Sequence, residues 1–275
     1  MNPADIELFV ALARARAGMK IDPAKTYLIE SRLSPLARRE GFAGIAELAG
    51  ALRTNRDDKL IWAVVEALAQ GETEFFRDRA VFETFRQEIL PTLARLRGSA
   101  PIKVWSCACA TGQEAYSLAM LAEEAEGLPP GAEVEVYGSD ISERALEKAQ
   151  SGLYTQFEVQ RGLPIRRLLN HFEKVEDNWR LTPRIRQRVR WRRVNLIADM
   201  TSMGQFDVIF CRHLLSAMDP PYRRRVLEAL SALLPPDGLL VLGPQETAES
   251  ITDAVRPLPG RSGVYVRNPA FRAAA

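Results

Sequence analysis

Two stretches with chemically useful side chains stand where buried strands are predicted to end. Residues 102–105 form an apolar run typical of a short strand, and the stretch 106–114 follows it directly. A second predicted strand, residues 133–138, is followed by Asp140. Ligands of parallel sheets bind outside the carboxyl ends of the strands, so these stretches are candidates for a binding site. The Asp140 carboxylate could accept both hydroxyls of a ribose, or it could cap the helix predicted over 142–150.

The stretch 106–114 reads Ser-Cys-Ala-Cys-Ala-Thr-Gly-Gln-Glu, and its small residues would let the backbone approach a ligand closely. It lacks the Gly-x-Gly-x-x-Gly pattern of a dinucleotide site and the lysine of a P-loop. S-adenosylmethionine has no phosphate, so a loop without an anion cradle suits this cofactor better. The alternative is a tight strand-to-helix turn without a function.

The elements that would position these residues alternate between strand and helix from about residue 100 onward. This alternation predicts an α/β fold with a parallel sheet covered by helices on both faces. Residues 1–70 predict helices only, one of them starting at Asp22-Pro23. The predicted strands are residues 102–105, 133–138, 189–194, 206–210, 239–242 and a terminal edge strand over 263–266.

These patterns divide the chain into a helical domain over 1–70, a linker over 71–100 and an α/β domain over 101–275. The linker contains a helix over 80–96 that Pro91 could kink. Residues of about 155–188 interrupt the alternation, so we expect an inserted subdomain there.

Composition excludes several classes of protein. The net charge of +2 on 275 residues gives no argument for a nucleic-acid partner. The start has no signal-peptide pattern, and no apolar run approaches the roughly 20 residues that span a bilayer. Three cysteines make a disulfide framework improbable, so we expect a cytoplasmic protein with no membrane insertion. With two histidines and no Cys-x-x-Cys pair we expect no metal site, and we interpret the cysteines as small apolar residues.

Six motifs stand out along the chain, which are Glu72–Asp78, Val104–Ser117, Gly138–Ser142, Ala149–Tyr154, Val194–Leu196 and Phe206–Arg212. Together they resemble the chemotaxis receptor methyltransferase (CheR) family, and they occur in the order of that family. The resemblance implies a Rossmann-like S-adenosylmethionine-dependent methyltransferase sheet that carries a small antiparallel β-subdomain and follows an all-α domain. It also implies the activity, which is esterification of glutamate side chains on chemoreceptors, with S-adenosylhomocysteine as the product.

The resemblance further implies the roles of particular positions. From the linker, Thr73 and Arg77 would reach the cofactor or the reacting centre, and Arg77 is the candidate for orienting the accepting carboxylate. Alternatively, Arg77 forms a surface ion pair with Asp78 or Glu74. The amino-acid part of the cofactor would be held by Glu114 and its ribose by Asp140. The adenine would be flanked by Asn195 and Leu196, and the methyl-transfer site would be lined by His213 and Leu214.

The chain departs from the family pattern near the reaction centre. An asparagine of the family is replaced by His213, a tyrosine by Ala217 and a linker asparagine by Gly71; Gln113 and Ala115 also differ, while Glu114 is kept. His213 could be a catalytic residue or a cofactor contact. Alternatively, it could be a core histidine whose ring nitrogens are satisfied by hydrogen bonds. The departures leave open a second hypothesis, a cofactor-binding regulatory module with little or no turnover. A nucleic-acid methyltransferase is a third.

The expected partner is the cytoplasmic helical bundle of a methyl-accepting chemoreceptor. Lys25, Arg32 and Arg39 recur every seven residues on one predicted helix, and this basic stripe could dock on an acidic bundle or be a solvated face. Some family members use the β-subdomain to hold a C-terminal receptor pentapeptide through a glycine-containing loop. The matching stretch, residues 172–179, is short and has no glycine, so we expect that this tether is not needed.

Two further patterns have competing interpretations. Residues 151–194 carry an excess of arginine, which indicates either an anionic partner or exposed arginines flanking buried residues. Asp219-Pro220-Pro221-Tyr222 imitates a motif of amino-group DNA methyltransferases, but eight residues separate it from the fourth strand. We therefore interpret Asp219 as a helix cap with Pro220 following.

Overall fold

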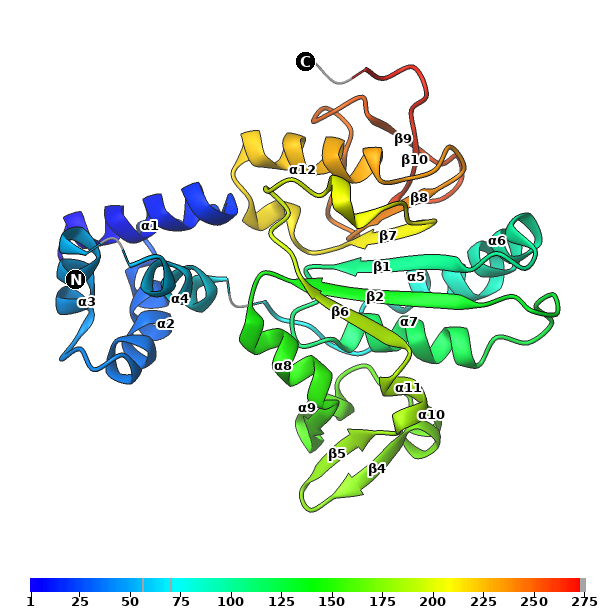
Figure 1. The fold of residues 1–275 in the computed structure, drawn as a ribbon, viewed down its shortest axis with the longest axis horizontal. Coiled ribbons are helices and arrows are strands. Elements are labelled where there is room, and N and C mark those ends of the chain that lie inside the picture. The colour runs from blue at the N-terminus through cyan, green and yellow to red at the C-terminus, as the bar shows by residue number, and fades with distance from the viewer. Residues whose placement is uncertain (56, 70, 273–275) are drawn as a thin grey trace.

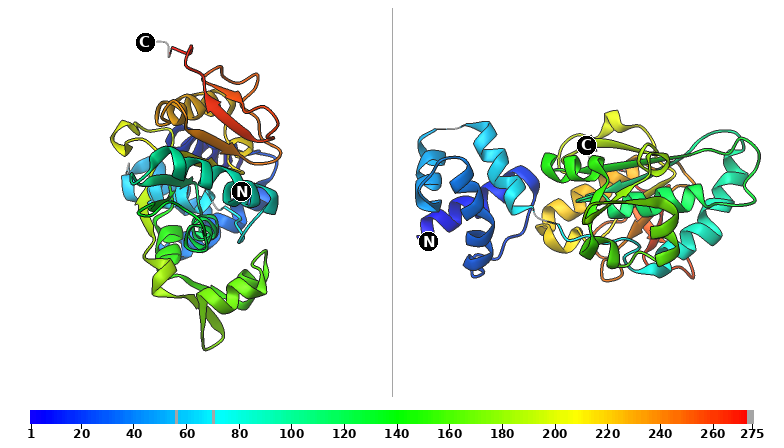
Figure 2. Two further views of the ribbon diagram at one scale, coloured as in Figure 1. Left: turned by 90° about the vertical axis from the view of Figure 1, so that its right-hand side faces the viewer. Right: turned by 90° about the horizontal axis from the view of Figure 1, so that it is seen from below.

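Four helices form the amino-terminal unit of the computed structural model, which describes residues 1–55, 57–69 and 71–272. Their apolar faces meet around fully buried Phe9, Leu33 and Val64. The helices are α1 (Pro3–Ala17), α2 (Thr26–Arg39), α3 (Ile45–Thr54) and α4 (Asp58–Leu68). In Figures 1 and 2 this unit lies beside the rest of the chain.

The predicted start of α2 at Asp22-Pro23 is wrong. Asp22 instead opens a turn: its carboxylate accepts a hydrogen bond from the Ala24 N–H at 3.0 Å, and its carbonyl accepts one from the Lys25 N–H at 3.0 Å. The helix begins at Thr26, after this turn has used the capping oxygen.

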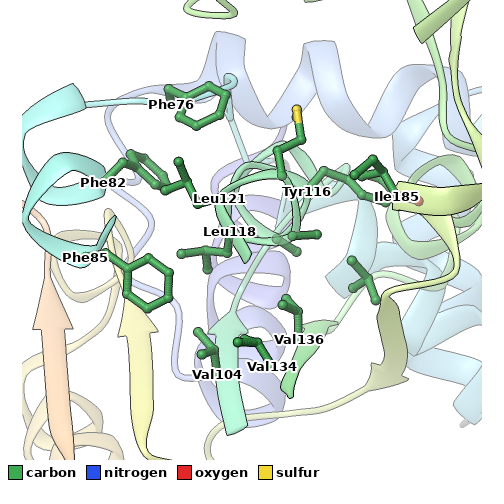
Figure 3. Close-up of a cluster of buried hydrophobic side chains, with 14 of the residues drawn as sticks. Phe76, Phe82, Phe85, Val104, Tyr116, Leu118, Leu121, Val134, Val136 and Ile185 are labelled. Atoms are coloured by element: carbon green, nitrogen blue, oxygen red, sulfur yellow. The ribbon is translucent and has the colours of Figure 1, made fainter. Parts of the chain in front are cut away.

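The linker packs as part of the core rather than as a free connection. Phe76, Phe82 and Phe85 are buried in one cluster with helix α7 (Gln113–Glu123), as Figure 3 shows. The predicted helix over 80–96 consists of α5 (Arg79–Thr84), the π-helical turn η1 (Phe85–Ile89) and α6 (Leu90–Arg97). Pro91 has no N–H to continue the regular ladder, and the widened turn just before it is typical of a π-bulge.

A seven-stranded sheet forms the centre of the carboxyl-terminal part, in the order β6-β2-β1-β7-β8-β10-β9. The first five strands in this order are parallel, β10 pairs antiparallel with β8, and β9 pairs antiparallel with β10. The strands are β1 (Ile102–Cys107), β2 (Val134–Asp140), β6 (Val189–Arg193), β7 (Val208–Cys211), β8 (Leu239–Leu242), β9 (Val255–Pro257) and β10 (Val264–Arg267).

Helices cover both faces of this sheet, as the alternation predicted. Val104 of β1 points to the cluster that contains α7, and the next residue, Trp105, points to the cluster that contains α12 (Pro220–Ala232). Helix α8 (Glu143–Ser151) follows β2, and the short 3₁₀ turns are η2 (Thr201–Met203) and η3 (Leu215–Ala217). The Rossmann-like arrangement is thereby confirmed. In Figure 1, β1 and β2 run toward the helical unit.

The insertion is a small antiparallel sheet of order β3-β5-β4, also as expected. It begins at Leu153, slightly earlier than predicted, because β3 pairs with β5. Its elements are β3 (Leu153–Thr155), α9 (Gln156–Gln160), α10 (Ile165–His171), β4 (Phe172–Val175), β5 (Asn178–Leu181) and α11 (Pro183–Arg186).

Much of the arginine excess of this region is used within the chain. Arg184 and Arg188 both pair with Glu123 of α7, and Arg190 pairs with Glu135 at 2.8 Å. These ion pairs attach the insertion and β6 to neighbouring elements, so the excess by itself does not indicate an anionic partner.

None of the helices among the described residues has the length and apolar character that a bilayer crossing requires.

Candidate functional site

A cavity of about 530 Å³ lies between the helical unit, the linker and the carboxyl ends of β1, β2, β6 and β7. Its volume falls in the range of roughly 300–1,000 Å³ that is typical of small-molecule sites. All eight positions to which the sequence assigns a cofactor or catalytic role line it, although they come from five separate segments. They are Thr73, Arg77, Glu114, Asp140, Asn195, Leu196, His213 and Leu214.

The loop after β1 forms one wall of the cavity with a constrained backbone. Ala108 and Ala110 have positive φ angles of 53° and 48°, which are uncommon for residues other than glycine. Gly112 has φ 92°, and a Cβ there would lie 2.8 Å from both the Ala149 Cβ and the Trp191 ring. Such strained turns are held by surrounding structure and cluster at functional sites.

Asp140 holds this loop from the end of β2. Its Oδ2 accepts a hydrogen bond from the Ala110 N–H at 2.9 Å, and its Oδ1 accepts one from the Ser142 N–H at 2.9 Å. Burial raises the pKa of Asp140 although these backbone bonds act in the opposite direction. The cap of α8 is Ser142, whose hydroxyl accepts from the Ala145 N–H, so the capping alternative for Asp140 is wrong. Each Asp140 oxygen keeps a lone pair, as bidentate acceptance of two hydroxyls requires.

A buried arginine that the sequence did not single out connects the end of β7 to the linker. Arg212 donates from Nη1 to Glu114 Oε2 at 2.8 Å and from Nη2 to Asp78 Oδ2 at 2.6 Å. Nη2 also donates to the Arg77 carbonyl at 2.9 Å. The other Glu114 oxygen accepts from the Ser106 hydroxyl at 2.8 Å. Arg212 therefore fixes both Glu114, a candidate cofactor-binding residue, and the part of the linker that contains Arg77 and Asp78.

His213 and Arg77 make separate contacts with the linker. The imidazole Nε2 of His213 donates to Asp78 Oδ2 at 2.9 Å, so its tautomer is set by a carboxylate that Arg212 also contacts. Arg77 donates from Nη1 to the Glu72 carbonyl at 3.0 Å. Its alternative role as a surface pair is wrong, because Asp78 binds Arg212 and His213, while Glu74 pairs with Arg161. Arg77 is half-buried at the cavity wall.

Asn195 joins the two units as well as lining the cavity. Its Nδ2 donates to the Arg16 carbonyl of α1 at 2.7 Å, and its Oδ1 accepts from the Ile197 N–H at 3.3 Å. The side chain is thus oriented by the helical unit, a role that the sequence did not indicate. Leu196 adds an apolar surface beside it.

The end of α1 closes another side of the cavity through backbone bonds. The Lys20 N–H donates to the Ala217 carbonyl at 2.8 Å, and the Asp219 N–H donates to the Gly18 carbonyl at 2.9 Å. Gly18 has φ 65°, and a Cβ there would lie 2.8 Å from the Tyr222 ring. Asp219 occupies the N-cap position of α12 with Pro220 as the first helical residue, so the motif is a helix start as predicted. Its side chain makes no capping hydrogen bond, however, and pairs with Arg14 instead.

The three residues of the proposed docking stripe occupy different environments. Lys25 is the residue just before α2, so the prediction that all three lie on one helix is wrong for this position. Lys25 and Arg39 are exposed, and Arg39 is paired with Glu40. Arg32 is half-buried, donates to the Leu68 carbonyl at 2.7 Å and lines the cavity. The seven-residue spacing predicted a shared face but gave no indication that Arg32 is turned toward the site.

The cysteines are buried thiols. Burial raises the pKa of both Cys107 and Cys109, which keeps them protonated near neutral pH. Cys211 is also buried and unpaired by any disulfide. They serve as small packing residues at the strand ends, in agreement with the sequence interpretation.

Comparisons with known proteins agree with this geometry. The family "CheR methyltransferase, SAM binding domain" matches residues 71–264, and "CheR methyltransferase, all-alpha domain" matches residues 4–69. Chemotaxis protein methyltransferase 1 of Pseudomonas aeruginosa is 34% identical over 96% of this chain and 97% of its own length. Chemotaxis protein methyltransferase Cher2 of Pseudomonas putida is 31% identical over 90% of this chain and 92% of its own.

A third relative, the probable biofilm formation methyltransferase WspC of Pseudomonas putida, is 33% identical over 94% of this chain and 61% of its own length. The cavity therefore lies within the matched cofactor-binding domain and is bounded on one side by the matched helical domain. The chain belongs to the CheR methyltransferase family, and it is an S-adenosylmethionine-dependent methyltransferase of the chemotaxis type.

Proposed function

We propose that this methyltransferase esterifies glutamate side-chain carboxylates on the cytoplasmic helical bundle of a chemoreceptor. One observation carries the proposal: the cavity wall includes the Arg77 guanidinium, a permanent cation that can orient an anionic acceptor, and among the described residues only its Nη1 is engaged, by the Glu72 carbonyl. A carboxylate acceptor is already ionised at neutral pH and needs no base, whereas an amine, a hydroxyl or a nucleobase has a proton to lose.

When bound, S-adenosylmethionine supplies a methyl group on a cationic sulfur. The residues of the chain then have to orient the acceptor and exclude water. Arg77 is therefore the proposed orienting residue, because it lines the cavity and among the described residues uses only its Nη1, on the Glu72 carbonyl. His213 would hold the linker through its bond to Asp78. Glu114 and Asp140 would hold the amino-acid part and the ribose of the cofactor, with Asn195 and Leu196 beside the adenine.

The acceptor would arrive over α2, where Lys25 and Arg39 present exposed positive charge. Complementary charge chiefly accelerates encounter and fixes orientation, so this surface suits an acidic helical bundle. Arg32, which is continuous with the cavity wall, would lie between that surface and the reacting centre.

We further propose that no receptor pentapeptide tether is required. Val175 of β4 pairs directly with Asn178 of β5, so these strands are joined by a tight turn of Glu176 and Asp177. This hairpin has no glycine-containing loop that could close over an added peptide strand.

Tritiated methyl transfer to receptor-containing membranes, measured beside calorimetric cofactor binding, tests the proposal. We expect alkali-labile label in the receptor, as a methyl ester gives, and equal labelling of a receptor that lacks its last five residues. Label in nucleic acid, or alkali-stable label in protein, would overturn the glutamate assignment. Cofactor binding without transfer to any acceptor would favour the regulatory-module hypothesis.

A further inference from the structure

Glu246 lines the cavity, and its carboxylate makes an unusual set of contacts with the backbone. One of its oxygens, Oε2, accepts hydrogen bonds from the His213 N–H at 2.7 Å and the Gly243 N–H at 2.9 Å. The other, Oε1, accepts from the Leu215 N–H at 2.7 Å. A single carboxylate thus connects the loop after β7 with the loop after β8. Hydrogen bonds to a charged acceptor are roughly twice as strong as neutral ones.

The loop after β7 needs such support because its conformation is costly. His213 has φ 60°, a left-handed conformation that residues with a Cβ seldom adopt. This turn brings the imidazole to Asp78 and places Leu214 against the cavity. Residues held in such regions persist only where neighbouring contacts over-determine them.

Gly243 provides independent evidence that the arrangement is built around the carboxylate. A Cβ at this position would lie 2.7 Å from Glu246 Oε2 and 3.1 Å from the His213 nitrogen. Glycine therefore leaves the space that the carboxylate fills. Glu246 is half-buried, and both of its oxygens already accept backbone N–H groups.

We propose that Glu246 is a positioning residue, which sets cofactor affinity by holding the His213–Leu215 loop in its left-handed turn. It acts through its hydrogen bonds to the backbone of the loop and not through a contact of its own with the cofactor. This inference goes beyond the glutamate proposal and does not depend on which acceptor is methylated. Its readout is the binding of S-adenosylhomocysteine, so its failure and the failure of the glutamate proposal can be told apart.

The test is a double-mutant cycle between Glu246→Gln and His213→Asn, with the dissociation constant measured by calorimetry. Asparagine tolerates the left-handed conformation better than other residues with a Cβ, so His213→Asn lowers the need for the clamp. We expect Glu246→Gln to weaken binding by about tenfold or more in the wild-type background. In the His213→Asn background the loss should be about threefold or less, because the turn then needs less external support.

Glu249→Gln is the matched control, since Glu249 is exposed on the same loop and should leave binding unchanged. An equal loss in both backgrounds would overturn the proposal, because it would indicate direct ligand contact or general destabilisation. An effect no larger than that of the control would also overturn it. If Glu246→Gln does not fold, Glu246→Asp keeps the charge but shortens the reach, and the same comparison applies.

Discussion

Arg212 donates a 2.6 Å hydrogen bond to Asp78, and this contact joins the end of the central strand β7 to the linker. The guanidinium side chain is only 1% exposed, whereas the Asp78 side chain is 37% exposed. The same guanidinium holds Glu114, whose side chain is 12% exposed. Removing the arginine would therefore leave a buried acid without its partner.

We predict that Arg212→Met destabilises the fold by about 3 kcal/mol, because breaking a buried ion pair costs more than the pair contributes. S-adenosylhomocysteine should also bind more weakly, since Glu114 and the linker lose their common anchor. Urea unfolding and calorimetry measure the two effects. Arg79→Met, at an exposed position on α5, is the control; similar values for both variants would contradict the role of Arg212.

Gly18→Ala should destabilise the joint between the two units. The new Cβ would lie 2.8 Å from the Tyr222 ring, and the alanine would also have to adopt the left-handed φ of 65°. We expect a cost of about 2–4 kcal/mol, composed of about 1 kcal/mol for the backbone and about 1–3 kcal/mol for overpacking. Gly41→Ala separates the two causes, because Gly41 has φ 83° with no atom within 4 Å of the added Cβ. Equal unfolding free energies for both variants would show that the contact with Tyr222 is unimportant.

Asp140 should make the apo protein less stable as pH rises. Burial raises the pKa of Asp140 above its ordinary value of 3.8, so the folded state binds more protons than the unfolded state just above that pH. Stability attributable to this group then falls as pH increases through the raised pKa. The unfolding free energy of Asp140→Asn, relative to wild type, should therefore increase over that interval. A constant difference between pH 3.5 and 7 would refute the assignment.

Glu124 should have the opposite pH dependence. Burial opposes ionisation of this carboxyl, but hydrogen bonds from His171 and Arg167 outweigh it and lower its pKa to about 2. The stability that Glu124 provides is present above about 4.5 and is lost as pH falls toward 2. Acid unfolding of Glu124→Gln should therefore lack part of the loss seen in wild type. Glu126→Gln, an exposed neighbour, should unfold as wild type does.

The basic surface of α2 should affect the receptor and not the cofactor. Lys25→Glu should raise the KM for receptor methylation up to about fivefold, the equivalent of about 1 kcal/mol for an exposed charge. Cofactor affinity should not change, because Lys25 is absent from the described cavity lining. Arg95→Glu reverses a charge on α6, whose residues are absent from the described cavity lining, and should change neither the KM for the receptor nor the cofactor affinity. A cofactor defect in Lys25→Glu would contradict the docking assignment.

The fold could be predicted well from the sequence because most of the longer elements carry a recognisable apolar pattern. The strand predicted over 239–242 is found there without change, and Asp140 ends β2 as expected. Strand β9 was missed because it contains Pro257 and covers only three residues, too few to give a periodic signal.

The site residues could be placed from the family resemblance, and all of them except Thr73 and Arg77 come after a predicted strand, but the contacts among them could not be predicted. Arg212 meets Glu114 and Asp78 across 98 and 134 positions of the chain, and no local pattern encodes such pairs. Glu246 lies in a loop between β8 and β9 and carries no periodic signal. Its role depends on three backbone N–H groups, and their positions follow only from the folded chain.

The cavity is bounded by both units, from the end of α1 to the carboxyl ends of the strands. A molecule bound there contacts both units, so separating them would break its contacts with one of them. By linkage, interactions that hold the two units together therefore also raise the affinity for that molecule, and its binding stabilises their association by the same free energy.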